Sequence, residues 1–111
     1  MGVATAEIVG RDRPVVLCDV RRDRLDAAVA ALTKLGIPVV PVHADVTDRK
    51  AVARVFDTAA GLGTIASVIH TAGVSPSMGD AEYVLRTNAI GTLNVNEVFY
   101  AAASEGAAIV N

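Results

Sequence analysis

Acidic and small residues follow three separate apolar stretches of this sequence. Asp19 and Asp45 come after the first two stretches, and the third ends in a turn of small residues, Thr71, Ala72 and Gly73. Carboxylates at strand ends can accept hydrogen bonds from ribose hydroxyls, and glycine lets a backbone approach a phosphate or a ribose closely. The three segments together predict a dinucleotide site.

The spacing of Gly2 and Asp19 favours the same chemistry. Asp19 follows Gly2 at close to the roughly 20 residues that separate a phosphate-binding glycine from a ribose-binding acid. A carboxylate there repels the extra phosphate of NADP and favours NAD, whereas Arg21 or Arg22 could bind that phosphate. The alternative is structural: Asp19 caps a strand-to-helix turn and both arginines are solvated.

Asp45 and Val46 lie where a carboxylate could accept a hydrogen bond from the adenine amino group, with a neighbouring backbone N–H completing the recognition. The alternative is that Asp45 and Asp48 serve the start of the following helix. Position favours adenine, because ligands of open α/β sheets bind at the carboxyl ends of the strands.

Hydrophobic periodicity predicts alternating helices and strands. Helices are expected over 2–9, 22–35, 49–62 and 80–104, and strands over 14–18, 37–43, 64–70 and 107–110. Pro38 and Pro41 cannot donate to a ladder, so their strand should lie at a sheet edge. This alternation predicts an α/β fold, a Rossmann-type doubly wound parallel sheet.

Composition narrows the class of protein. The chain has 111 residues, enough for one small domain, and 52% of them are hydrophobic. A net charge of -2 offers no basic surface for nucleic acid, and no apolar run is long enough to span a membrane. The single cysteine fits a reducing compartment, so a cytoplasmic location is expected. No metal site is predicted.

Taken in order, these motifs resemble the short-chain dehydrogenase/reductase family. The family's turn Thr-Gly-x-x-x-Gly-x-Gly would end at Met1-Gly2, and its Asn-Asn-Ala-Gly turn corresponds to His70-Thr71-Ala72-Gly73, where His70 and Thr71 replace both asparagines. The remaining matches are Asp19, Asp45-Val46, and Asn88 with Gly91. The resemblance covers the whole chain.

The resemblance implies an oxidoreductase that uses NAD, or less readily NADP, to interconvert an alcohol and a ketone. Asn88 matches a family asparagine that perturbs its helix and holds a water of the proton relay. Its alternative is an ordinary helical Asn that faces solvent or bonds the preceding turn. The family's Tyr-x-x-x-Lys pair has no match here, since Thr87 follows Tyr83 and Ser104 follows Tyr100. The 111-residue chain alone is therefore expected to be inactive.

The family strand order, 3-2-1-4-5, implies that residues 1–111 form a partial NAD(P)-binding Rossmann domain with strands 2 to 5. Its absent central strand would lie between the strands at 14–18 and 64–70. The isolated chain is thus expected to be poorly folded or self-associated. Family members are often homo-oligomers.

Two other interpretations stay open. Val68-Ile69-His70 and the segment from Asn88 to Asn94 also resemble NAD-dependent nucleotide-sugar epimerases or dehydratases. A small non-catalytic module for nucleotide binding or protein interaction is the third interpretation.

Overall fold

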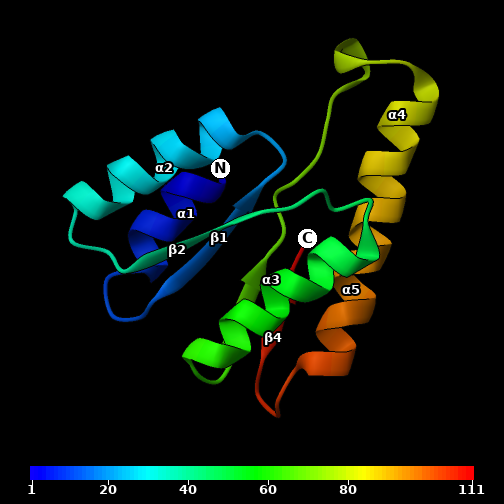
Figure 1. Ribbon diagram of the computed structural model, residues 1–111. Coiled ribbons are helices and arrows are strands. Elements are labelled where there is room, and N and C mark those ends of the chain that lie inside the picture. The colour runs from blue at the N-terminus through cyan, green and yellow to red at the C-terminus, as the bar shows by residue number, and fades with distance from the viewer.

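A computed structural model describes all residues 1–111 and contains alternating helices and strands (Figure 1). The α-helices are α1 (Gly2–Val9), α2 (Arg22–Lys34), α3 (Arg49–Leu62), α4 (Ala81–Leu85) and α5 (Gly91–Ala102). A short 3-10 helix, η1 (Pro76–Met78), precedes α4, and a π-helical segment, η2 (Arg86–Ile90), joins α4 to α5. The strands are β1 (Val15–Asp19), β2 (Val39–His43), β3 (Ser67–Ile69) and β4 (Ala108–Val110). The expected α/β class is confirmed.

The strands form two separate parallel pairs rather than one continuous sheet. β1 pairs with β2, and β3 pairs with β4. In the first pair Val15 lies opposite Val39, and in the second Ser67 lies opposite Ala108. No hydrogen-bonded ladder joins β1 to β3.

The prolines of β2 explain its place at an edge. Val15 N donates to Pro38 O, and Ala44 N donates to Asp19 O. Bonding alternates along a strand, so the backbone groups of Pro41 face away from β1. The missing N–H of Pro41 therefore costs the sheet no bond, and the predicted edge position is confirmed.

The predicted strand bounds are wrong at several ends. β1 begins at Val15 and includes Asp19, β2 begins at Val39, and β4 begins at Ala108. The strand expected over 64–70 shrinks to Ser67–Ile69. A periodic apolar run does not show where ladder bonds stop, and β3 has a partner on one side only.

The helical region expected over 80–104 is observed from Ala81 to Ala102, and η2, which contains Asn88, interrupts its α-helical geometry. In this segment Gly91 N donates to Arg86 O, a bond across five residues that accommodates one extra residue in the turn. Gly91 follows and packs closely on Val46: a Cβ at position 91 would lie 2.6 Å from Val46 Cγ2. The absence of a side chain at Gly91 therefore lets α5 approach the loop after β2.

Two small hydrophobic cores lie on either side of the molecule. One lies between α1, α2 and the first sheet, and is built on Ala6, Leu32 and Ile37. The other lies where α3 and α5 pack side by side against the second sheet (Figure 1). Its buried members are Val46, Val52, Phe56, Val95, Val98 and Phe99. Helices thus cover opposite faces of the two strand pairs, as in a doubly wound sheet. None of the helices combines the length and apolarity that a membrane crossing requires.

Candidate functional site

The start of α1 lies against the turn that follows β3. A Cβ on Gly2 would lie 2.9 Å from Thr71 Oγ1, so only glycine fits without displacing the threonine. No side chain caps the N-terminus of α1. The first amide groups of this helix are therefore free of side-chain acceptors, which is the arrangement that binds anionic groups elsewhere.

Asp19 closes β1 with one carboxylate oxygen engaged. Its Oδ1 accepts a hydrogen bond from Arg21 N at 2.8 Å, and Oδ2 accepts none from the protein. The Arg21 guanidinium donates two hydrogen bonds to the Asp23 carboxylate, and this pairing lowers the pKa of Asp23. Asp19 thus accepts a bond within its own turn, and its Oδ2 has no hydrogen-bond donor in the protein.

Asp45 and Asp48 have distinct local roles. Asp48 is the N-cap of α3 and accepts from Lys50 N at 2.9 Å. Asp45 Oδ1 accepts from both the N–H and the hydroxyl of Thr47, each at 2.8 Å. Asp48 rather than Asp45 therefore caps α3. No group of the protein donates a hydrogen bond to Asp45 Oδ2. Val46 is buried behind it.

His70, at the end of β3, is joined to η2 through Thr92. Thr92 Oγ1 donates to Asn88 O at 2.7 Å and lies 3.1 Å from His70 Nε2. Since the threonine hydrogen is already used, His70 Nε2 must be the donor in the second bond. Burial lowers the pKa of His70, which favours this neutral form.

The side chain of Asn88 is held by the loop after Gly73. Asn88 Oδ1 accepts from Val74 N at 2.9 Å, and Asn88 Nδ2 donates to Val74 O at 2.8 Å. A Cβ on Gly73 would lie 3.3 Å from Asn88 Oδ1. The turn and η2 thus fit closely because residue 73 is glycine.

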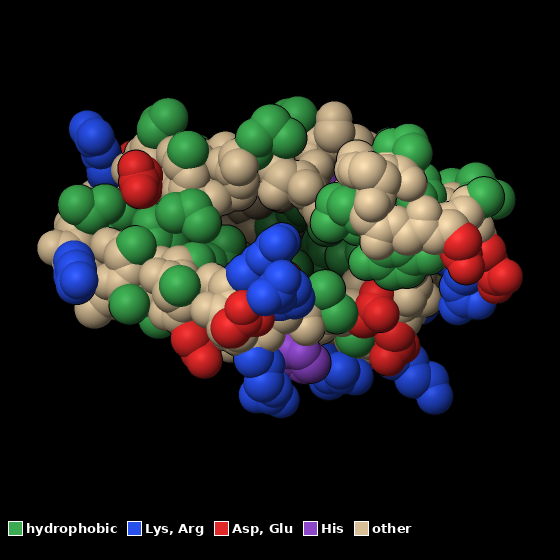
Figure 2. Space-filling model, turned by 90° about the horizontal axis from the view of Figure 1, so that it is seen from above, with side chains coloured by type: hydrophobic (Ala, Val, Ile, Leu, Met, Phe, Trp, Pro, Cys, Tyr) green, Lys and Arg blue, Asp and Glu red, His purple; other side chains and the backbone are tan.

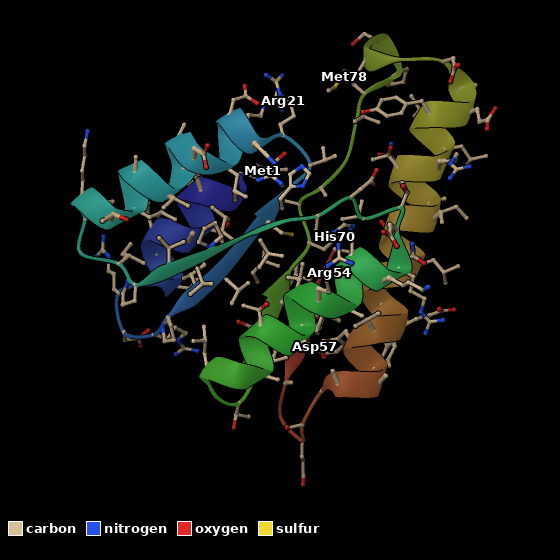
Figure 3. All side chains as sticks on the ribbon, viewed as in Figure 1. Met1, Arg21, Arg54, Asp57, His70 and Met78 are labelled. Atoms are coloured by element: carbon tan, nitrogen blue, oxygen red, sulfur yellow. The ribbon has the colours of Figure 1, made fainter.

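Some of the predicted site residues share a cavity and others do not. A cavity of about 360 Å³ opens between the two sheets, and Figure 2 shows the hollow with hydrophobic side chains in its walls. Gly2, Val46, Thr71 and Ala72 line it. Asp19, Asp45, Gly73 and Asn88 lie outside this lining. Figure 3 shows Met1 at the start of α1, Arg21 before α2, and His70 after β3.

Thr92 and Asn94 have structural roles that the sequence patterns did not assign. Asn94 is buried, and its Nδ2 donates to Val46 O at 2.9 Å. Thr92 links His70 to Asn88. The one available signal was a pair of polar residues within a mostly apolar helix, which does not identify their partners.

Comparison with known proteins gives the family. The model of the short chain dehydrogenase family matches residues 1–111. The chain belongs to the short-chain dehydrogenase family. This is a family of oxidoreductases, so the resemblance in the sequence is confirmed, and the nucleotide-sugar alternative is not favoured.

Curated relatives of this short-chain dehydrogenase come from fungi. The short chain dehydrogenase/reductase dpchG of Colletotrichum higginsianum is 32% identical over 90 residues, which are 78% of this chain and 34% of that protein. The short-chain dehydrogenase/reductase bsc3 of Alternaria brassicicola is 29% identical over 92 residues, 83% of this chain and 34% of the relative. The chain thus spans about a third of the length of these relatives.

Solved structures support the same assignment. The citronellol catabolism dehydrogenase AtuB of Pseudomonas aeruginosa has a TM-score of 0.83 and 27% identity, over 99% of this chain and 49% of that one. A 3-oxoacyl-[acyl-carrier protein] reductase from Brucella melitensis, with bound NAD, has a TM-score of 0.72 at 24% identity, over 90% of this chain and 43% of that one. At that identity the second similarity concerns the fold alone.

Proposed function

We propose that residues 1–111 are the nucleotide-binding part of an NAD(P)-dependent oxidoreductase, whose intact form transfers a hydride between the cofactor and a small alcohol or ketone. The observation that carries the proposal is the close approach of Gly2 to Thr71. It brings an uncapped helix N-terminus beside the turn after β3, at the carboxyl ends of two strands. A larger residue at position 2 would require the Thr71 side chain to shift.

The residues around this approach fit a dinucleotide. The first amides of α1, at Gly2, suit the pyrophosphate, and the free oxygen of Asp19 suits the ribose hydroxyls of the adenosine half. Asp45 Oδ2 and the backbone N–H of Val46 suit the adenine ring. Ala72 and Gly73, with Thr71, would lie against the nicotinamide ribose.

The chain's own residues then position the cofactor. When bound, the nicotinamide would supply the hydride donor or acceptor. The bonds between Asn88 and Val74 hold the turn in place, and the bond from Thr92 fixes the carbonyl of Asn88. We propose this ordered carbonyl as the group through which Asn88 binds the water of a proton relay.

NAD is the cofactor we favour over NADP. The Asp19 carboxylate repels a second phosphate, and Arg21 is engaged by Asp23. The single free cysteine, Cys18, is consistent with a reducing compartment, and we propose a cytoplasmic location. We also propose that the intact protein is a homo-oligomer, as the family often is.

Binding of NAD to the 111-residue chain tests the proposal. Calorimetry and saturation-transfer NMR should detect NAD binding to the chain, and Asp19→Ala should weaken it. Asp57→Ala is the matched control, because Asp57 is an exposed carboxylate on α3 without a hydrogen-bond or ion-pair partner. Circular dichroism first establishes that the chain has its helical content in solution. Absence of NAD binding by the folded chain, or equal losses in both variants, would contradict the assignment.

Turnover is a separate test. No Tyr-x-x-x-Lys pair occurs in residues 1–111, so NAD should not be reduced when the chain is mixed with secondary alcohols. Steady formation of NADH above a heat-treated sample would show that other residues perform the proton transfer.

A further inference from the structure

The peptide group that joins Val20 to Arg21 is held at both ends. Its carbonyl oxygen, Val20 O, lies 2.9 Å from His43 Nε2, and its N–H donates to Asp19 Oδ1 at 2.8 Å. A carbonyl oxygen only accepts hydrogen bonds, so the hydrogen of the first contact is on Nε2 and His43 is the donor. The last residues of β1 and β2 together hold one peptide group of the turn that leads from β1 into α2.

His43 and Asp19 contact this peptide group from opposite sides. The two residues lie opposite each other in the parallel register of β1 and β2. The chain has no cis peptide bond, and the C=O and N–H of a planar trans peptide point in opposite directions. The peptide group therefore lies between the imidazole of His43 and the carboxylate of Asp19. His43 acts on that carboxylate through the peptide and not by direct contact.

Few other polar contacts hold the turn. Arg21 is the N-cap residue of α2, and no side chain caps the helix there. The Arg21 guanidinium bonds Asp23, which lies within the helix. Val20 and His43 are both exposed, so water would replace the histidine at Val20 O if the imidazole were removed. The two bonds to the peptide between residues 20 and 21 are therefore the contacts that fix its orientation.

The orientation of this peptide determines how the Asp19 carboxylate is held. Asp19 Oδ1 accepts from Arg21 N, and Oδ2 has no donor in the protein. If the peptide rotated by half a turn, its carbonyl oxygen would face Asp19 Oδ1, and the two negatively polarised oxygens would repel each other. The carboxylate would then turn away. A donor on β2 that prevents this rotation fixes the direction of Asp19 Oδ2.

We propose that His43 is a positioning residue for cofactor recognition. The inference rests on the proposed function, in which Asp19 Oδ2 binds the ribose of NAD. His43 does not touch the cofactor: its Nε2–H fixes the peptide between Val20 and Arg21, and this peptide directs the Asp19 carboxylate toward the ribose hydroxyls. The preference for NAD over NADP therefore depends on a histidine of the neighbouring strand.

Two amide substitutions separate the donor from the imidazole ring. Glutamine places its amide N–H group near the position of Nε2, whereas asparagine, one carbon shorter, places it near Nδ1 and out of reach of Val20 O. His43→Gln should therefore keep the bond, and His43→Asn should lose it. Both side chains are polar and uncharged at an exposed position of an edge strand. Circular dichroism checks that both variants keep the helical content of the unmodified chain.

NMR of the 111-residue chain without NAD tests the peptide itself. In His43→Asn the Arg21 amide proton should move upfield and exchange with water about tenfold faster, because its bond to Asp19 is weakened. In His43→Gln its position and exchange rate should be unchanged. An unchanged Arg21 signal in His43→Asn, or the same change in both variants, would overturn the inference whether or not NAD binds.

Calorimetry with NAD tests the consequence for the cofactor. The affinity for NAD should fall about fivefold in His43→Asn and by less than about twofold in His43→Gln, and the ratio of NAD to NADP affinity should fall only in His43→Asn. In an Asp19→Ala background His43→Asn should have no further effect, because His43 acts through that carboxylate. Additive losses in the double variant would contradict this route.

The outcomes distinguish the role of His43 from the proposed function. If Asp19→Ala weakens NAD binding and His43→Asn does not, the proposed function holds and the positioning role is wrong. If the Arg21 signal responds as expected and Asp19→Ala leaves the affinity for NAD unchanged, His43 does hold the peptide. In that case Asp19 does not bind the ribose, and the positioning role is rejected together with that part of the proposed function.

Discussion

The side-chain amide of Asn88 bonds both backbone polar groups of Val74, 14 residues earlier in the chain. The two bonds, of 2.9 Å and 2.8 Å, fasten the π-helical segment to the loop that leaves β3. Asn88 therefore couples the unusual turn of the long helix to the proposed cofactor site. A carboxylate or an aliphatic side chain could not make both bonds.

We predict that Asn88→Leu lowers the free energy of unfolding by about 1–3 kcal/mol, since two hydrogen bonds are lost. Urea titration followed by circular dichroism measures the change. Arg86→Ala is the matched control, because Arg86 is exposed in the same turn and its side chain has no partner. A loss for Arg86→Ala as large as that for Asn88→Leu would mean that the π-helical segment is sensitive to any substitution.

Asp19→Ala should narrow or reverse the preference for NAD in an intact form of the enzyme. Under the proposed function, removal of the carboxylate would abolish the proposed bond to the ribose and the proposed repulsion of the NADP phosphate. We expect the ratio of kcat/KM for NAD over NADP to fall by about tenfold, which corresponds to roughly 1.4 kcal/mol. Equal kcat/KM values for the two cofactors in the unmodified enzyme would contradict the role of Asp19.

Asp23→Ala should change the affinity of the protein for NADP. Arg21 is bound to Asp23 by two bonds, and loss of that partner frees the guanidinium beside Asp19. We expect tighter binding of NADP and unchanged binding of NAD, measured by calorimetry. Asp26→Ala serves as the control for a lost negative charge on α2, and tighter NADP binding in both variants would point to net charge alone.

Gly91→Ala should destabilise the protein even though alanine favours helices. The new Cβ would lie 2.6 Å from Val46 Cγ2, so α5 or the loop after β2 must move. We expect a loss of about 1–3 kcal/mol. Gly61→Ala, on α3 with open space around it, is the control and should be neutral or stabilising.

The stability of the protein should fall as the pH drops below about 7. Burial lowers the pKa of His70 from its ordinary value of 6.5, so the unfolded chain takes up this proton first. The free energy of unfolding should therefore fall as the pH passes through 6.5 toward the pKa of the folded state, and level off below it. His70→Gln should remove this part of the dependence, measured by urea titration between pH 5 and 8.

His43→Gln is the matched control for the pH series. His43 lies on the outer strand β2, where its Nε2 is 2.9 Å from Val20 O. The pH dependence assigned to His70 should survive in this variant. Its disappearance in His43→Gln and survival in His70→Gln would reverse the assignment.

Local patterns determined several elements from the sequence alone. The helices over Gly2–Val9 and Arg49–Leu62 have the predicted bounds, because glycine ends the first and an aspartate caps the second. The edge position of β2 followed from its prolines. The order of short motifs along the sequence also predicted the family, because each motif consists of a few adjacent residues that can be recognised without the fold.

Only the tertiary structure decided how those elements combine. The bond from Asn94 to Val46 spans 48 residues, and that from Asn88 to Val74 spans 14, so neither is encoded in a local pattern. The π-helical turn and the close approach of Gly91 to Val46 arise where α5 packs on the loop after β2. The division into two sheets likewise depends on ladder bonds between distant segments, and such bonds form only when the chain has folded.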